Sequence, residues 1–260
     1  MSVSTSIGVG GIAPDPDGVF RLPLERTVLR RRYNRFLADV ERTDGSVITV
    51  HVPNTGSMAT LNHPGCDAWI AAAANPNRKL AWTLTLVGTP GGGLAIVDTQ
   101  WPNRLVAAGI TAGRVPALTG YAHLRREVVF GSRGSRADIA LTGHATQPDA
   151  LIEVKNVTML GAPGRADFPD AVSERGQKHL AELADVAQAG GRAVQFYCLS
   201  RTDCAGVGLA EGIDPAYAAA ARRAAAVGVQ FHAHRVVLQQ QDGVTLLGLG
   251  PEVPVDLGSA

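Results

Sequence analysis

The sequence predicts an all-β unit followed by an α/β unit, and two observations carry this prediction. In the first third of the chain, short apolar segments alternate with turn signals such as Asp44-Gly45 and Pro64-Gly65. Strands at such close spacing are typical of a small barrel or sandwich. From about Tyr121 onward, three strands are followed by helices that alternate with further strands, an order that indicates an α/β core.

The all-β unit is expected at residues 19–88, after a flexible tail at residues 1–18. Its predicted strands are Glu25–Tyr33, Phe36–Val40, Val47–Val52, Ala68–Ala73 and Leu80–Val87. The glycine-rich segment Thr89-Pro90-Gly91-Gly92-Gly93 is typical of a loop and closes this unit.

The α/β unit is expected at residues 89–238, with residues 239–260 as a weakly patterned tail. Pro102 suits the first turn of a helix that runs to about Ile110. Asp170 is a candidate cap for a later helix that Gly190-Gly191 ends, and Asp214-Pro215 opens another that Gly228 ends. The predicted strands are Leu94–Thr99, Leu124–Phe130, Arg136–Leu141, Ala150–Val157, Arg192–Leu199 and Val229–Leu238.

Composition limits the classes of function. The 260 residues are 45% hydrophobic and carry a net charge of +1, so a real core is available and any signal for a polyanionic partner must be local. The three cysteines form no CxxC pair, which suits a reducing compartment. The first residues have no basic and apolar pattern of a signal peptide, and no apolar run reaches the roughly 20 residues of a membrane span. We therefore expect a cytoplasmic protein without a membrane partner.

The segment Leu151–Thr158 is the strongest candidate for chemistry. It is an apolar strand in which Glu153 and Lys155 share one face, because side chains alternate along a strand. A neighbouring predicted strand carries a second carboxylate, Asp138. These acids and the backbone carbonyl of Val154 could hold part of the shell of a hard divalent cation such as Mg²⁺ or Mn²⁺.

Lys155 could then orient or deprotonate a water, or neutralise charge that develops on a phosphate. The competing interpretation is structural: Glu153 and Lys155 form an ion pair, and Asp138 is a turn or cap residue. An isolated Glu-x-Lys triplet favours the structural interpretation, since short motifs often match by chance.

A basic cluster lies in the first unit, between Arg21 and Arg35. Its arginines are interleaved with Tyr33 and Phe36, which resembles a groove that follows a nucleic-acid backbone and stacks its bases. A solvated edge strand whose charges prevent aggregation explains the same pattern equally well.

The helix after the central strand has an apolar stripe with a basic edge. Val172, Gly176, Leu180, Leu183 and Ala187 form the stripe at helical spacing. Arg175, His179 and Glu182 border it, Lys178 lies just beyond, and Gln177 points to the other side. Cations at this edge could bind phosphate oxygens, although a salt-bridged helix surface is the simpler interpretation.

Several stretches together resemble one family, that of sugar fermentation stimulation protein A (SfsA). They are Asn34-Arg35-Phe36-Leu37-Ala38-Asp39-Val40, Pro53-Asn54-Thr55-Gly56-Ser57-Met58, Glu153-Val154-Lys155-Asn156-Val157-Thr158 and the segment from Phe168 to Leu180, with Asp214-Pro215-Ala216-Tyr217 in support. The resemblance covers about Arg26 to Val236. It implies an N-terminal OB-like barrel, a C-terminal PD-(D/E)XK nuclease-like domain with a mixed central sheet, and DNA binding.

The resemblance also implies roles for single residues. Asp138 matches the first acid of the PD-(D/E)XK motif, Glu153 and Lys155 match its second half, and Glu127 stands at the place of an additional upstream acid. Ala137 and Ile139 flank Asp138 where larger or aromatic side chains are usual, a departure that affects packing more than charge. The polar segment with Asn54 and Thr55 could contact nucleic acid or close the barrel, and the resemblance favours contact.

Two hypotheses follow. The first is a Mg²⁺- or Mn²⁺-dependent nuclease that acts on DNA, with Asp138, Glu153 and Lys155 as catalytic residues and Asp138, Glu153, Val154 and Glu127 as metal ligands. The second is a non-catalytic DNA-binding regulator linked to sugar metabolism. Both predict DNA as the partner and leave a homodimer open. The expected DNA contacts are Arg30, Arg31, Arg32, Arg35, Asn54, Thr55, Arg175, Gln177, Lys178 and His179.

Overall fold

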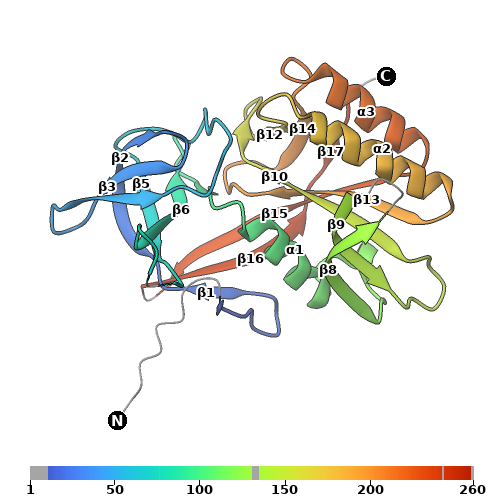
Figure 1. Cartoon of the computed structure of the whole chain (residues 1–260), viewed down its shortest axis with the longest axis horizontal. Coiled ribbons are helices and arrows are strands. Elements are labelled where there is room, and N and C mark those ends of the chain that lie inside the picture. Colours follow the sequence, from blue (N-terminus) through green and yellow to red (C-terminus); the bar gives the residue numbers. More distant parts are fainter. Residues whose placement is uncertain (1–10, 76, 131–134, 242, 259–260) are drawn as a thin grey trace, which may run out of the picture.

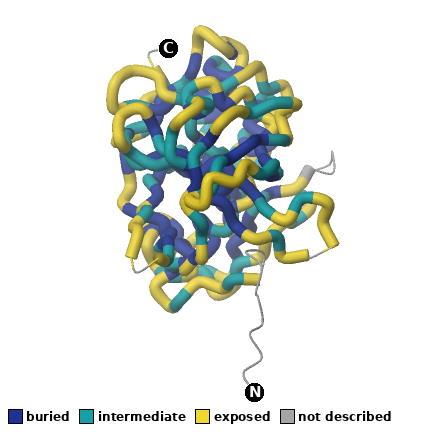
Figure 2. The backbone as a smooth tube through the Cα atoms, turned by 90° about the vertical axis from the view of Figure 1, so that its left-hand side faces the viewer, coloured by how far each residue is buried: buried dark blue, intermediate teal, exposed yellow. Residues whose placement is uncertain are grey.

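The computed structural model describes residues 11–75, 77–130, 135–241 and 243–258. Figure 1 shows a small barrel beside a larger α/β part, in which helices lie on both sides of a twisted sheet. The buried backbone runs through the interior of the molecule, and the exposed segments are mostly the loops at its periphery (Figure 2).

The barrel consists of five antiparallel strands joined into a ring. In spatial order they are β4 (Val47–His51), β3 (Leu37–Glu41), β2 (Glu25–Tyr33), β5 (Asp67–Ala72) and β6 (Trp82–Gly88), and a parallel bridge between His51 and Thr83 closes the ring. Its interior is filled by inward-facing aliphatic residues such as Leu29, Ile70 and Leu84. All five strands were predicted from the sequence to within two residues at each end.

The barrel extends further than the predicted boundary at Gly88. The strand β7 (Leu94–Ile96) pairs with β6 across the glycine-rich loop, so it belongs to the barrel sheet and not to the α/β part. The loop is a hairpin connection between these two strands, which a glycine-rich segment forms as readily as a linker between domains.

The α/β part contains a mixed sheet of seven strands. Their spatial order is β1 (Phe20–Leu22), β16 (Val244–Glu252), β15 (Gln230–Gln241), β13 (Arg192–Leu199), β10 (Ala150–Val157), β9 (Ser135–Thr142) and β8 (His123–Phe130). The central strands β10, β13 and β15 are parallel, and the outer pairs are antiparallel. β10 is therefore covered on both sides by other strands.

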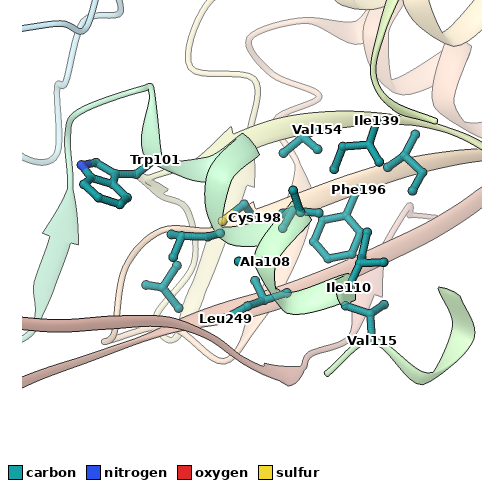
Figure 3. Packing of buried hydrophobic residues seen from close by; sticks show 14 of the residues in the cluster. Trp101, Ala108, Ile110, Val115, Ile139, Val154, Phe196, Cys198 and Leu249 are labelled. Atoms are coloured by element: carbon teal, nitrogen blue, oxygen red, sulfur yellow. The ribbon is translucent and has the colours of Figure 1, made fainter. Parts of the chain in front are cut away.

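Helices cover the two faces of this sheet. On one face α1 (Trp101–Thr111) packs on the apolar side chains of the sheet, including Ile139, Val154 and Phe196, and it is followed by the short helix η2 (Pro116–Leu118) (Figure 3). On the other face α2 (Glu174–Gln188) packs against β13 and against α3 (Pro215–Ala226). The alternation along β10 consequently turns Ile152 and Val154 towards α1 and Glu153 and Lys155 towards α2.

A second, smaller sheet was not anticipated. It consists of β11 (Met159–Leu160), β12 (Arg165–Phe168), β14 (Gly206–Leu209) and β17 (Val255–Asp256). Strands of two to four residues carry too little periodicity to be recognised in a sequence.

The prediction of a tail at each end of the chain is wrong for the residues that the structure describes. The segment after Gln239 completes β15 and forms β16, whose Leu247 and Leu249 are buried. At the other end, the part of the expected tail that is described, residues 11–18, packs through Ile12 against the hydrophobic cluster formed by α1 and the sheet. The rest of that tail lies outside the described residues. Both segments are ordered by contacts with residues that are distant in the sequence. No local pattern therefore predicts these segments.

The start of α2 also differs from the prediction. The cap is Ser173, whose hydroxyl accepts the N–H of Gly176, and not Asp170. Asp170 instead lies against Gly56 of the barrel: a Cβ atom added at Gly56 would stand 2.5 Å from its carboxylate. Val172 precedes the helix and is 67% exposed, so it does not belong to the apolar stripe. Among the described residues, no helix is long and apolar enough to cross a membrane.

Candidate metal and nucleic-acid site

The two acids of the predicted motif lie where β9 and β10 separate. The ladder between these strands ends with the pair Ile152 and Ile139. The residues that follow in the same register are Glu153 and Asp138. Residues opposite each other in a ladder have their side chains on one face of the sheet. Beyond the last pair, the backbone N–H of Val154 donates to Asp138 Oδ2 at 2.7 Å. A carboxylate thus takes the place of a backbone acceptor at the point of separation.

A second contact fixes Asp138 from the helix α1. Asn103 Nδ2, in the first turn of α1, donates to Asp138 Oδ1 at 2.7 Å. Each carboxylate oxygen therefore accepts one hydrogen bond and retains a lone pair. Asn103 could not be predicted from the sequence, because only the packing of α1 on the sheet brings it to β9.

Glu153 lies in a small cluster with two nitrogen groups. It is 6% exposed. The Lys155 Nζ atom is 2.6 Å from Glu153 Oε1, and the same oxygen makes a close hydrogen bond with Nδ1 of His179 from α2. Lys155 Nζ and His179 Nδ1 are 3.4 Å apart. Three of the predicted residues are therefore in direct contact, and His179 is part of the cluster and not of the outer surface.

The two carboxylates have opposite electrostatic surroundings. Burial and the neighbouring negative charge of Glu153 raise the pKa of Asp138 above its usual value. Burial also acts to raise the pKa of Glu153, but the hydrogen bond with His179 and the positive charge of Lys155 outweigh it, so that the net pKa of Glu153 is lowered. The partners of Glu153 thus stabilise its negative charge, and this charge acts as a repulsion on Asp138.

Glu127 lies at the level of Asp138 on the neighbouring strand. In the pairing of β8 with β9, Arg126 is opposite Ile139 and Val128 is opposite Ala137, and Glu127 and Asp138 stand between these pairs. Glu127 is exposed and has a left-handed backbone, with φ of 55°. A non-glycine residue in this region is uncommon and is often found at functional sites.

The donor set is suited to a cation that keeps water. Among the described residues, no three histidine, cysteine or acidic side chains come together as a metal-binding group. Mg²⁺ commonly binds proteins through one or two carboxylates and completes its shell with water and phosphate oxygens. The pair Asp138 and Glu153 fits this pattern and does not fit a structural zinc site, which needs four protein ligands.

The basic edge of α2 only partly agrees with the prediction. Arg175 and Lys178 are exposed, as expected. Arg175 Nε is 3.4 Å from His179 Nε2, so this guanidinium adjoins the cluster around Glu153. Gln177 has a partner within the protein: its amide donates to Asp214, the cap of α3, at 3.0 Å.

The arginines of the barrel are engaged by the barrel itself. Each of three is paired with an acid on a neighbouring strand: Arg26 with Asp67, Arg30 with Glu41 and Arg31 with Asp39. The edge-strand interpretation also fails, since β2 is paired on both sides, with β3 and β5. Three arginines of the cluster are therefore held in cross-strand ion pairs of the closed sheet, whereas Arg21 lies on β1 in the seven-stranded sheet.

Arg32 and Asn54 hold the polar loop at residues 53–58. The Arg32 guanidinium donates to four backbone carbonyls, those of Arg35, Asn54, Gly56 and Ser57. Asn54 is buried and donates to the carbonyl of Val97 at 3.2 Å. Both were predicted as DNA contacts, and the structure gives them an architectural role. Of the other predicted contacts in the barrel, Thr55 and Arg35 are exposed.

The fold thus joins an OB-like barrel to an α/β domain with a mixed central sheet, in which two acids and a lysine lie where two strands separate. Comparisons with known proteins agree. Residues 31–97 match the SfsA N-terminal OB domain, and residues 100–242 match the sugar fermentation stimulation protein RE domain. The chain belongs to the SfsA family.

Curated relatives are similar over most of the chain. A sugar fermentation stimulation protein homolog of Rhodospirillum rubrum is 45% identical over 223 residues, which cover 82% of this chain and 90% of the relative. One of Pseudomonas paraeruginosa is 48% identical over 216 residues, covering 83% and 91%. Among solved structures, that of Pyrococcus furiosus SfsA in complex with Ca²⁺ has a TM-score of 0.77 at 24% identity, covering 90% of this chain and 96% of that one.

Proposed function

We propose that this protein binds DNA and hydrolyses its phosphodiester bonds with a divalent cation, Mg²⁺ or Mn²⁺, held by Asp138 and Glu153. One observation carries the proposal. Two carboxylates occupy adjacent positions where two strands separate, and burial, together with the neighbouring charge of Glu153, raises the pKa of Asp138. A cation between them relieves the repulsion of the two carboxylates. The relative from Pyrococcus furiosus, described in complex with Ca²⁺, supports a divalent cation in this family.

Each group of the cluster has a distinct task in this proposal. The N–H of Val154 and the amide of Asn103 hold the Asp138 carboxylate in one orientation. His179 does the same for Glu153. A bound divalent cation supplies a water of lowered pKa and neutralises charge on the phosphate.

Lys155 and Arg175 provide the positive charge that the reaction needs. Lys155 is close enough to Glu153 to orient the attacking water or to neutralise the charge that develops on the phosphate. Arg175 is exposed beside His179, where its fork of donors suits a phosphate of the bound strand.

A second function is favoured by a specific observation. Glu153 is already satisfied by Lys155 and His179 without a cation, as a structural ion pair would be. On this alternative the α/β domain is a scaffold, and the protein binds DNA without cleaving it.

Cleavage of supercoiled plasmid and linear DNA separates the two functions. Wild type is compared with Asp138→Asn and Glu153→Gln, in Mg²⁺, in Mn²⁺ and in EDTA. Removal of one group that stabilises the charge of the transition state typically lowers the rate by about 10²–10³-fold. We therefore expect metal-dependent nicking that both variants lose to at least this extent.

Asp67→Asn is the matched control, because Asp67 is an acid of the barrel outside the cluster. It should nick as fast as wild type. Equal nicking by all four proteins, independent of metal, would exclude catalysis at this site. DNA binding without any nicking would favour the scaffold.

A further inference from the structure

The hairpin formed by β8 and β9 presents arginines beside the acid cluster. Arg125 of β8 is opposite Ala140, and Arg136 of β9 is opposite Val129. Both arginines are exposed. Within the ranges that the structure describes, neither makes a hydrogen bond or an ion pair with an acid, in contrast to Arg26, Arg30 and Arg31 of β2.

Strand alternation defines the face on which these arginines lie. Ile139 and Leu141 point into the core beneath α1, so the intervening residues of β9 point to the opposite face. Arg136 and Asp138 are therefore on one face, and Arg125 joins them across the ladder. This is the face towards which Glu153 and Lys155 point.

Arg126 lies on the other side of the same hairpin. It is opposite Ile139 and lines a cavity together with Arg104, Ala107 and Thr111 of α1. Like its neighbour Arg125, it is exposed and carries a positive charge. The chain thus offers two consecutive arginines that differ in the face they occupy.

The helices leave the outer part of the acid-bearing face open. The helix α2 packs on β13, in the middle of the sheet, and β8 is the edge strand. Arg175 and Lys178 border the acid cluster on the side of α2. Cations consequently flank Asp138 and Glu153 on two sides, and Glu127, the acid on this part of β8, is level with Asp138.

We infer that the open face of the β8–β9 hairpin, through Arg125 and Arg136, binds the phosphate backbone of DNA next to the acid cluster. The inference rests on the proposed function and names the surface that holds the substrate. Unpaired guanidinium groups keep their donors free for phosphate oxygens, and binding a phosphate costs them no existing ion pair. Arg26, Arg30 and Arg31 of the barrel would have to exchange an acid for a phosphate.

Salt-dependent DNA binding tests this surface. The affinity of a short fluorescein-labelled duplex is measured by anisotropy in EDTA over a range of KCl concentrations, so that cleavage cannot interfere. Each phosphate neutralised by the protein contributes about 0.9 to the slope of log affinity against log salt. For Arg125→Ala/Arg136→Ala we expect the slope to fall by about 2 and the affinity at moderate salt to fall about tenfold.

Two variants serve as controls. Arg126→Ala removes the same charge from the opposite face, and Arg30→Ala/Arg31→Ala removes two paired charges from the barrel. Both should keep a slope close to that of wild type. Thermal unfolding of every variant verifies that it is folded.

The outcomes separate this inference from the proposed function. If the double variant of the hairpin keeps the slope of wild type, or if Arg126→Ala lowers it equally, the hairpin face is not the binding surface. If the wild type nicks DNA while only the barrel variant loses slope, the surface is wrong and the proposed function stands. If the wild type does not bind DNA, the proposed function itself fails.

Discussion

Three exposed arginines of the barrel and two exposed arginines of the α/β domain differ in their partners. Arg26, Arg30 and Arg31 each face an acid on a neighbouring strand. Arg125 and Arg136 are exposed beside the acid cluster without such a partner in the described part of the chain. The density of basic residues in a sequence is therefore a poor guide to a polyanion surface. The strand register, which determines the acids that lie opposite the basic residues, is the better guide.

The acids of the two regions also differ in their surroundings. In the barrel, Asp39 accepts hydrogen bonds from Arg31, Tyr33 and Thr49, and its pKa is lowered. In the α/β domain, Asp138 has a raised pKa and a like charge as its neighbour. A buried acid with a like charge as its neighbour and a raised pKa is a candidate for function.

The largest effect on stability is expected at the junction of the two regions. Burial raises the pKa of Asp98, between β7 and α1, to about 6, although the N–H of Gln100 and the charges of Arg104 and Arg78 oppose the rise. The folded protein thus binds this proton more tightly than the unfolded chain. The ionised form of Asp98 therefore lowers the free energy of unfolding above about pH 6. This loss disappears as the pH falls towards about 4.

Asp98→Asn should therefore raise the free energy of unfolding by up to about 3 kcal/mol at pH 8 and leave it unchanged at pH 4. The asparagine oxygen can still accept the N–H of Gln100. Urea unfolding at both pH values measures the effect. An equal change at both would show that ionisation of Asp98 is not its source.

The next effect is expected at His179, which holds Glu153 from α2. Removing the partner that orients a metal ligand typically weakens metal binding by about 10–100-fold. His179→Ala should show this loss in a Mn²⁺ titration. His179→Asn, whose amide nitrogen can replace Nδ1, should recover part of the affinity. If both variants bind Mn²⁺ as wild type does, His179 has no part in holding the cation.

Arg32 should affect stability and not DNA affinity. It donates to four carbonyls around the loop at residues 53–58, and hydrogen bonds from a charged group contribute about 1.5 kcal/mol or more. Arg32→Ala should lower the free energy of unfolding by at least about this amount and leave the salt slope of DNA binding unchanged. A large fall in that slope would instead place Arg32 on the DNA.

Arg30 gives the smallest expected effect. Its ion pair with Glu41 is partly exposed, and pairs of this kind contribute about 0–1 kcal/mol. Arg30→Ala and Glu41→Ala should each change the free energy of unfolding by less than about 1 kcal/mol in urea. A loss above this limit in either variant would show that the pair is more than a surface contact.

Local patterns in the sequence predicted most of the fold. The limits of Glu25–Tyr33 and Ala150–Val157 agree with β2 and β10, because β-branched and apolar residues bounded by turns mark strands well. The cap at Asp214 was also predicted, and its side chain accepts the N–H of Tyr217. The strand β16 was missed, since three glycines and a proline lie in or beside its apolar residues and its partners, β1 and β15, are far away in the sequence.

The candidate site could be predicted only in part. The alternation that puts Glu153 and Lys155 on one face is local and was read correctly. The approach of Asp138 to Glu153 depends on the register of β9 and β10, and that of Asn103 and His179 depends on helix packing. The partners of Arg30 and Arg31 lie across the hairpin from β2 to β3, where a register derived from the turn at Asn34 would have revealed them.

Binding of Mn²⁺ measured by isothermal titration calorimetry tests the central claim most directly, because it requires neither DNA nor cleavage. We expect wild type to bind the ion saturably, and Asp138→Asn and Glu153→Gln to lose that binding, while Asp67→Asn retains it. Binding of Mn²⁺ by all four proteins with the same affinity, or by none, would contradict the assignment of Asp138 and Glu153 as the metal site.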